Sequence, residues 1–311
     1  MEVFSYHPGI CRAPSETVLA LGFFDGVHLG HRALIALAAE KAKDLGLPLG
    51  VFTFPAEDRA MKKKEPRLYD TKQKLSLLSS LGVNYVFMCE FSSVMNISAE
   101  EFACRCLVSD LRAAVTVCGF NYRFGRGAEG NAEALARYMQ ALGRENVTLP
   151  PTYYEGELLS STAIRAHLLK GDVEKAAKML GAPYVLSGEV EGGDGRGKTL
   201  GFPTVNLSMA EDRILLSSGV YATVASTREG DFPSVTNVGT CPTFGERSIH
   251  AETHLCGFSG NLYGQSVEVK FISRLRDEKL FSSKEELIKQ INVDKNKAEE
   301  VYERWLKAGR S

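Results

Sequence analysis

Two histidines stand three residues apart in a glycine-rich stretch near the start of this 311-residue chain. They are His28 and His31, and the apolar run Thr17–Gly22 just before them has the pattern of a strand. Residues three apart share one face of a helix, and the first turn of a helix attracts phosphates through unpaired N–H groups and the helix dipole. Two imidazoles placed there could donate hydrogen bonds to a triphosphate and stabilise the charge that develops on its α-phosphate and on departing pyrophosphate. The stretch therefore predicts nucleotidyl transfer with His28 and His31 as catalytic residues.

The same stretch also has a purely structural explanation. Its glycines would make a turn between a strand and a helix, and its histidines would be solvated capping residues. However, two of only six histidines in one anion-binding turn are hard to explain as packing, and a metal site lacks an obvious third ligand. We therefore favour the functional explanation. The residues expected to bind the nucleotide here are Gly22, Phe23, Asp25, Gly26 and Gly30.

Two further segments could complete this first site. Asn121 and Arg123 follow another strand-like run, so the amide could bond the edge of a base and the guanidinium could meet a phosphate. Ser161 and Thr162 could cap a helix whose first turn carries Arg165, an arrangement that suits a phosphate. A basic surface loop and ordinary helix capping are the alternatives for these two segments.

A second site is predicted in the C-terminal half, where a glycine-rich loop precedes Thr204 and Asn206. The glycines would let the loop fold over phosphates, and its basic residues would neutralise their charge. Thr204 and Asn206 are two apart at what has the pattern of a strand start, so their side chains share a face and, together with nucleotide phosphates, could seat Mg²⁺. A β-turn in which both side chains bond their own backbone is the alternative. The loop residues expected to bind the nucleotide are Gly195, Lys198, Gly201 and Pro203.

Glu252 is the carboxylate best placed to act as a base in this second site. It lies in the strand-like run His250–Leu255 and could deprotonate a substrate hydroxyl, although a surface glutamate on a strand is the ordinary alternative. Asn237 begins a loop that would line the entrance, and Arg274 and Arg276 lie on another. We expect these three residues to contact the bound ligands.

The elements that must hold these residues change in kind along the chain. The first half alternates strand-like apolar runs with helical patterns, which is typical of a parallel sheet wrapped by helices. From Tyr184 onward, short strands alternate with Gly- and Pro-rich turns, which indicates a small antiparallel Greek-key β-barrel. A final helix over Lys284–Leu306 should pack on that barrel. We therefore predict an α/β domain at residues 1–182 and an all-β domain at residues 183–311.

The expected strands and helices follow from these patterns. In the first domain the strands are Thr17–Gly22, Leu49–Phe54, Tyr85–Cys89, Ala114–Cys118 and a further one to which Val147–Leu149 leads. Its helices are Gly30–Leu45, Thr71–Leu81, Ser98–Leu107, Asn131–Leu142, Ser161–Leu169 and Val173–Leu180. The barrel strands are Tyr184–Val190, Gly219–Ser226, Ser234–Val238, His250–Leu255 and Ser266–Phe271.

Composition and charge argue against several kinds of partner. The 37 Lys and Arg residues against 38 Asp and Glu give a net charge of −1, so no summed field would hold the chain on nucleic acid or on an acidic membrane. No apolar run reaches the roughly 18 residues of a membrane span, and the N-terminal segment lacks the pattern of a signal peptide. Seven cysteines without a CxxC pair favour reduced thiols. We expect a cytoplasmic monomer or weak homo-oligomer with small-molecule substrates, no nucleic acid and no membrane partner.

Six motifs, taken together, resemble those of the bacterial bifunctional riboflavin kinase/FMN adenylyltransferase (FAD synthetase) family over nearly the whole chain. They are GxFDGxHxGH at Gly22–His31, GFNYRFG at Gly119–Gly125, SSTxIR at Ser160–Arg165, GRxxxLGFPTxN ending at Asn206, NVGTxPTF at Asn237–Phe244 and ExHL at Glu252–Leu255.

This resemblance implies an N-terminal nucleotidyltransferase domain of Rossmann-like fold that transfers AMP from ATP to FMN, followed by a barrel that phosphorylates the 5′ hydroxyl of riboflavin. It implies that Glu252 is the base, that Thr204 and Asn206 hold Mg²⁺, and that Asn121 contacts flavin or nucleotide. The substrates would be ATP, riboflavin and FMN. Family members usually carry an Asp-Pro-His-Pro run after the second strand, whereas Phe54–Arg59 has no His. This difference predicts slower or differently tuned adenylyl transfer.

Three other functions fit parts of the pattern. A kinase whose N-terminal half binds nucleotide without adenylylating would form FMN but no FAD. A flavin-binding regulator would bind flavin tightly and consume no ATP, but the HxGH pair and Glu252 argue against it. A cytidylyltransferase would use the first loop and leave the barrel unexplained.

Overall fold

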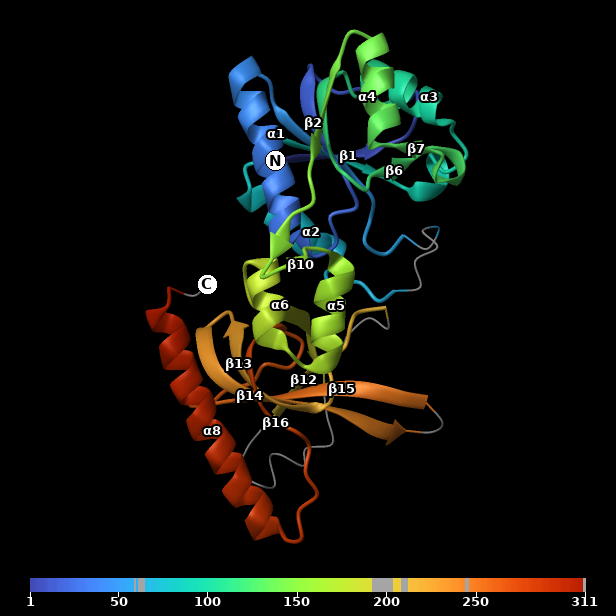
Figure 1. The fold of residues 1–311 in the computed structure, drawn as a ribbon. Coiled ribbons are helices and arrows are strands. Elements are labelled where there is room, and N and C mark those ends of the chain that lie inside the picture. Colours follow the sequence, from blue (N-terminus) through green and yellow to red (C-terminus); the bar gives the residue numbers. More distant parts are fainter. Residues whose placement is uncertain (59, 61–64, 192–203, 208–211, 244–245, 310–311) are drawn as a thin grey trace. The chain divides into compact units, whose positions relative to one another are not determined.

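The computed structural model describes residues 1–58, 60, 65–191, 204–207, 212–243 and 246–309. Within them the chain forms two compact units, Met1–Ser161 and Thr162–Ser311 (Figure 1). A parallel sheet with helices makes up the first unit and an antiparallel barrel makes up the second, so the predicted α/β plus all-β fold class is confirmed. In the part of the chain that the structure describes, no helix is long and apolar enough to cross a membrane.

The sheet of the first unit has six parallel strands in the order β1-β4-β3-β2-β5-β8. They are β1 (Glu2–Tyr6), β2 (Thr17–Leu21), β3 (Leu49–Thr53), β4 (Tyr85–Cys89), β5 (Ala113–Gly119) and β8 (Glu145–Leu149). Every residue of β2 and β3 is buried, as expected for parallel strands covered on both faces. The sequence predicted β2 to β5 and a further strand near β8, but it missed β1, an edge strand whose largely exposed residues give little apolar signal.

Helices cover both faces of this sheet. They are α1 (Leu29–Leu45), α2 (Thr71–Ser80), α3 (Ala99–Glu101) and α4 (Ala132–Ala141). The chain continues from α3 as a π-helix over Phe102–Asp110, which extends past the end predicted for this helix. Leu19 joins the core beneath the π-helix and α4, whereas Val18 joins the core beneath α1. Successive residues of β2 therefore serve opposite faces of the sheet.

The chain reverses its direction across the sheet between β2 and β5. From β2 it moves outward through β3 and β4, then returns to β5 on the other side of β2 and continues to β8. Loops that leave neighbouring strands at such a point diverge, and α/β proteins bind ligands in the crevice between them. The loops after β2 and β5 carry the two motifs Gly22–His31 and Gly119–Gly125. The shorter pairs β6 (Arg123–Phe124) with β7 (Gly130–Asn131) and β9 (Tyr153–Tyr154) with β10 (Glu157–Leu158) lie outside this sheet.

The second unit is a closed barrel of six antiparallel strands in the order β11-β12-β15-β14-β13-β16. They are β11 (Tyr184–Glu191), β12 (Thr204–Leu207), β13 (Gly219–Thr227), β14 (Gly230–Thr243), β15 (Glu246–Leu255) and β16 (Ser266–Arg276). Because β13, β14 and β15 follow one another and β16 returns beside β13, the topology is a Greek key, as predicted. The barrel is preceded by α5 (Ser161–Lys170) and α6 (Val173–Leu180) and followed by α8 (Lys284–Lys307).

A buried ion pair helps to hold α8 on the barrel. The helix packs against β13, β14 and β16 with Val301 and Trp305 buried. Asp294, which is 2% exposed, accepts hydrogen bonds from Arg276 at the end of β16, with Oδ2 lying 3.0 Å from Nε and 2.8 Å from Nη2. Removing one partner of such a pair leaves the other charge desolvated without compensation.

Replacement of Asp294 with Ala should lower the free energy of unfolding of the second unit by about 3 kcal/mol, because Arg276 would keep its desolvated charge without a partner. Asp277→Ala is the matched control: Asp277 pairs with Arg274, but its side chain is 86% exposed, and exposed pairs contribute at most about 1 kcal/mol. Denaturation followed by fluorescence measures both variants, since the single tryptophan, Trp305, lies on α8. Equal losses in the two variants would contradict the role given to the buried pair.

Candidate active sites

The loop after β2 is buried and has an unusual backbone shape. Phe24, Gly26 and Val27 have φ values of 55°, 80° and 41°. This left-handed conformation costs energy for Phe and Val and persists only where packing enforces it. Both side chains are 0% exposed. The loop ends at His28, which caps α1: its Nδ1 accepts a hydrogen bond from the backbone N–H of His31 at 3.3 Å.

The two histidines lie against each other on the first turn of α1. Their ring centroids are 3.7 Å apart with 19° between the planes, and Phe24 meets His31 edge-on at 5.3 Å. A Cβ at Gly30 would lie only 3.2 Å from the His28 ring, so the absence of a side chain makes room for it. Burial lowers the pKa of His31 well below 6.5, and the charges of His28 and Lys74 lower it further. A neutral imidazole keeps one N–H that can donate to a phosphate oxygen.

Two side chains fix the loop to later parts of the first unit. The carboxylate of Asp25 is 3% exposed, and its Oδ1 accepts a hydrogen bond from the Leu68 N–H at 3.0 Å. The Ser161 hydroxyl donates to the carbonyl oxygen of Asp25 at 2.9 Å. Of the residues predicted together with Ser161, Thr162 is exposed and Arg165 is buried, and both lie on α5 in the second unit.

The loop after β5 presents the other predicted residues of the first site. Leu21 at the end of β2 pairs with Cys118 in β5, so the two loops leave the sheet side by side. Asn121 and Arg123 are exposed, and Phe124 is buried in the core. The structure therefore brings the histidine pair and Asn121 to the same edge of the sheet.

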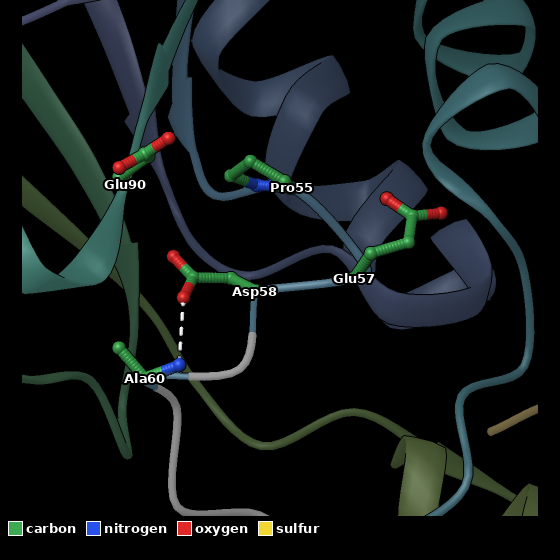
Figure 2. A pocket seen from close by; sticks show the side chains of 5 residues that line it. All are labelled: Pro55, Glu57, Asp58, Ala60 and Glu90. Carbon is green, nitrogen blue, oxygen red and sulfur yellow. Dashed lines mark hydrogen bonds between the residues drawn. The ribbon is translucent and has the colours of Figure 1, made fainter.

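The segment after β3 is acidic in this chain. Pro55, Glu57, Asp58 and Ala60 line a hollow of about 310 Å³ together with Glu90, which follows β4 (Figure 2). Burial raises the pKa of Glu57, but hydrogen bonds from Thr71 and the charge of Arg67 outweigh it and lower the pKa overall. Carboxylates repel phosphates, so this hollow itself does not suit the polyphosphate of a nucleotide.

The barrel register brings the predicted kinase-type residues into one row. Asn206 on β12 is directly opposite Glu252 on β15, and Glu252 is directly opposite Asn237 on β14. Side chains of directly opposed residues project from the same face about 5 Å apart. Thr253 is 0% exposed inside the barrel, so Glu252 faces outward together with the residues opposite it, Asn206 and Asn237. Thr204, two residues before Asn206, shares that outer face.

The donors in this row are of the kind that Mg²⁺ prefers. A threonine hydroxyl, an amide oxygen and a carboxylate are hard oxygen ligands. Thr204 and Asn206 thus fit the metal that the sequence predicts beside them. The predicted loop residues of this site, Gly195, Lys198, Gly201 and Pro203, lie outside the described residues.

The two predicted arginines of the barrel are engaged in contacts within the second unit. Arg274 donates from Nη2 to the carbonyl of Ser218 at 2.7 Å and from Nη1 to the carbonyl of Lys170 at 3.3 Å. Arg276 makes the ion pair with Asp294 on α8. These contacts give both guanidinium groups a structural role that the sequence did not suggest, because Lys170, Ser218 and Asp294 are distant from them in the chain.

Sequence reasoning missed Lys74, which lies beneath the histidine loop. It is 1% exposed on α2, four residues before the buried Leu78. A lysine at a position where the helical period calls for an apolar residue is the signal that could have found it.

Comparison with known proteins identifies the family. The model described as FAD synthetase matches residues 11–163, and the one described as riboflavin kinase matches residues 180–302. Proteins named bifunctional riboflavin kinase/FMN adenylyltransferase from Bacillus subtilis and Escherichia coli K12 are 33% and 36% identical to this chain. The alignments cover 94% of this chain and 94% and 95% of those proteins. The chain belongs to this family.

The resemblance read from the six motifs is thus confirmed, and structural similarity extends it. A crystal structure described as a macrolide-efflux protein from Streptococcus pneumoniae has a TM-score of 0.87 with this chain at 29% identity. The similarity covers 94% of this chain and 97% of that one. Both the sheet and the barrel therefore have a counterpart in that structure.

The pKa of His31 offers a direct check of the first site. We expect NMR titration of labelled histidine to place it below 6.5, and the substitution His28→Ala to raise it, because the variant loses a neighbouring charge and shields His31 less from water. His7→Ala, at an exposed histidine outside the loop, is the control and should leave the pKa of His31 unchanged. An unshifted His31 in the His28 variant would contradict the coupling of the stacked rings.

Proposed function

We propose that this chain makes FAD from riboflavin in two steps, each consuming ATP. The barrel phosphorylates the 5′ hydroxyl of riboflavin to give FMN and ADP. The first unit then transfers AMP from a second ATP to FMN, giving FAD and pyrophosphate. The observation that carries the proposal most strongly is the position of Glu252, directly between Asn206 and Asn237 on one face of the barrel.

In the kinase step Glu252 acts as the general base. Its carboxylate accepts the proton of the 5′ hydroxyl, the hydroxyl oxygen attacks the γ-phosphorus of ATP, and the bond to ADP breaks. Thr204 and Asn206 would hold Mg²⁺, which neutralises phosphate charge when bound. Asn237, Gly195, Lys198, Gly201 and Pro203 are the proposed ligand contacts. Arg274 and Arg276, near the end of β16, are also proposed as ligand contacts.

In the adenylyl-transfer step the histidine pair acts by positioning and hydrogen bonding. An oxygen of the FMN phosphate attacks the α-phosphorus of ATP, and the bond to pyrophosphate breaks. His28 and His31 donate to phosphate oxygens on which negative charge develops. The backbone from Gly22 to Gly30 surrounds the phosphates at the start of α1, and Asn121 contacts the base or the flavin.

The domain bounds, the location and the partners that we propose rest on the composition and on the contacts within each unit. We assign residues 1–182 to adenylyl transfer and residues 183–311 to the kinase, although residues 162–182 pack with the barrel. We place the enzyme in the cytoplasm as a monomer or weak homo-oligomer, without nucleic acid or membrane partners.

A second candidate is a riboflavin kinase whose first unit transfers AMP weakly or not at all. The acidic segment with Glu57 and Asp58 favours it, because carboxylates at the end of β3 repel the phosphates of ATP. Chromatography of the products from riboflavin, ATP and Mg²⁺ separates the two functions. We expect FMN first and then FAD. An accumulation of FMN without FAD would support the second candidate, and the absence of both products would refute both.

Replacement of Glu252 with Gln should lower kcat for riboflavin phosphorylation by about 100-fold or more, since a general base contributes roughly 10²–10⁴-fold. FAD formation from added FMN should be unchanged, because that step uses the other unit. Glu268→Gln is the matched control: it removes an exposed carboxylate from β16 of the same barrel and should leave kcat unaltered. Normal phosphorylation by the Glu252 variant would remove this residue from the mechanism.

A further inference from the structure

A buried ammonium group joins the ends of two neighbouring strands below the histidine loop. Lys74 on α2 is 1% exposed. Its Nζ donates to the carbonyl oxygen of Phe23 at 2.9 Å and to that of Phe54 at 2.8 Å, and it lies 4.3 Å from the centre of the Phe23 ring. Lysine is almost never fully buried unless its charge has partners, and here two carbonyl dipoles and an aromatic face provide them.

The two carbonyl groups belong to the loops that shape the first site. Phe23 comes two residues after the end of β2 and immediately before the left-handed Phe24. Phe54 follows β3, which pairs with β2. The Phe23 carbonyl also accepts a hydrogen bond from the Thr53 hydroxyl at 3.0 Å, and the Gly22 N–H donates to Phe52 at 3.3 Å. The beginning of the histidine loop is therefore attached to the end of β3, and Lys74 supplies the charged part of that attachment.

The ammonium group also acts on the histidines electrostatically. Burial lowers the pKa of Lys74 to about 8, while the carboxylates of Asp25 and Glu57 oppose the shift. Lys74 is thus mostly protonated at pH 7. Its charge is one of the causes that keep His31 neutral. A positive charge therefore lies close to the first turn of α1, where the polyphosphate of ATP would bind.

We propose that Lys74 is a positioning residue for adenylyl transfer: its ammonium group holds the Gly22–His31 loop to the end of β3 and adds positive charge beside the histidine pair. This inference rests on the proposed function of the first unit. Lys74 lies 43 positions after His31, on a different helix, and in this proposal it helps to set the shape of the loop. The same ammonium group satisfies the carbonyl oxygens of Phe23 and Phe54, which would otherwise lack these hydrogen bonds.

The test measures FAD formation from FMN and ATP, with riboflavin phosphorylation by the same purified chain as an internal control. Lys74→Met removes the charge and keeps a side chain of similar length, so the buried space stays filled. We expect kcat for FAD formation to fall about 100-fold, the size of loss that a small misplacement of catalytic groups causes, with KM for FMN changed by less than about twofold. Riboflavin phosphorylation should be unchanged. Lys72→Met, at an exposed position on the same helix, is the matched control and should keep wild-type kcat.

The pH dependence of kcat for FAD formation distinguishes a lysine whose charge contributes to the reaction from one with only a structural role. In the wild type, kcat for FAD formation should fall about tenfold between pH 7 and pH 9, as a group with a pKa of about 8 loses its proton. Lys74→Arg keeps its charge throughout that range, so its kcat should vary by less than about twofold. Asp25, Glu57 and His31 act electrostatically on Lys74 or respond to it, and all three are present in every variant. A difference between the profiles therefore reports Lys74.

Two results would overturn the proposal. One is a Lys74→Met variant that forms FAD at the wild-type rate, and the other is a single pH profile shared by the wild type and Lys74→Arg. A wild-type chain that makes FMN but no FAD gives a distinct outcome, recognised before any variant is compared. In that case the adenylyl-transfer function itself fails, and Lys74 has no such reaction to serve.

Discussion

The shape of the turn between β2 and α1 depends on packing, and the chemistry of the first unit depends on that turn. Phe24 and Val27 adopt left-handed backbone angles that their side chains disfavour, and both are completely buried. The strain is compensated by the surrounding core and by the bonds to the Phe23 carbonyl. Only with the chain turned in this way does His28 cap α1 while His31 stacks on it.

In the barrel, the position of the proposed base depends on a different constraint, the alternation of side chains along each strand. Thr253 points into the barrel, where its hydroxyl lies 2.9 Å from that of Thr236, and Glu252 consequently points out. A shift of one residue in the pairing of β15 would exchange these two side chains. It would place a carboxylate among buried hydroxyls and remove it from Asn206 and Asn237. The packing of the interior thus fixes the position of the proposed base.

The charged groups near the first site include carboxylates from two loops and one buried ammonium group. The segment after β3 contributes carboxylates such as Glu57, and Asp25 contributes another from the loop after β2. Lys74 lies between these elements, and the two carboxylates raise its pKa against the effect of burial. At the end of β3 this chain therefore has acidic side chains near a buried cation that comes from α2.

The sequence determined most of the elements and the residue types of both sites. Apolar runs marked β2 to β5, glycine spacing marked the loop with His28, and alternation marked the strand with Glu252, because these are local properties of a chain. Tertiary structure alone decided three things: the edge strand β1, the engagement of Arg274 and Arg276 by distant partners, and the burial of Lys74. Each of these depends on segments far apart in the chain that meet only after folding. No pattern of neighbouring residues encodes such a meeting, since it is set by the packing of whole elements.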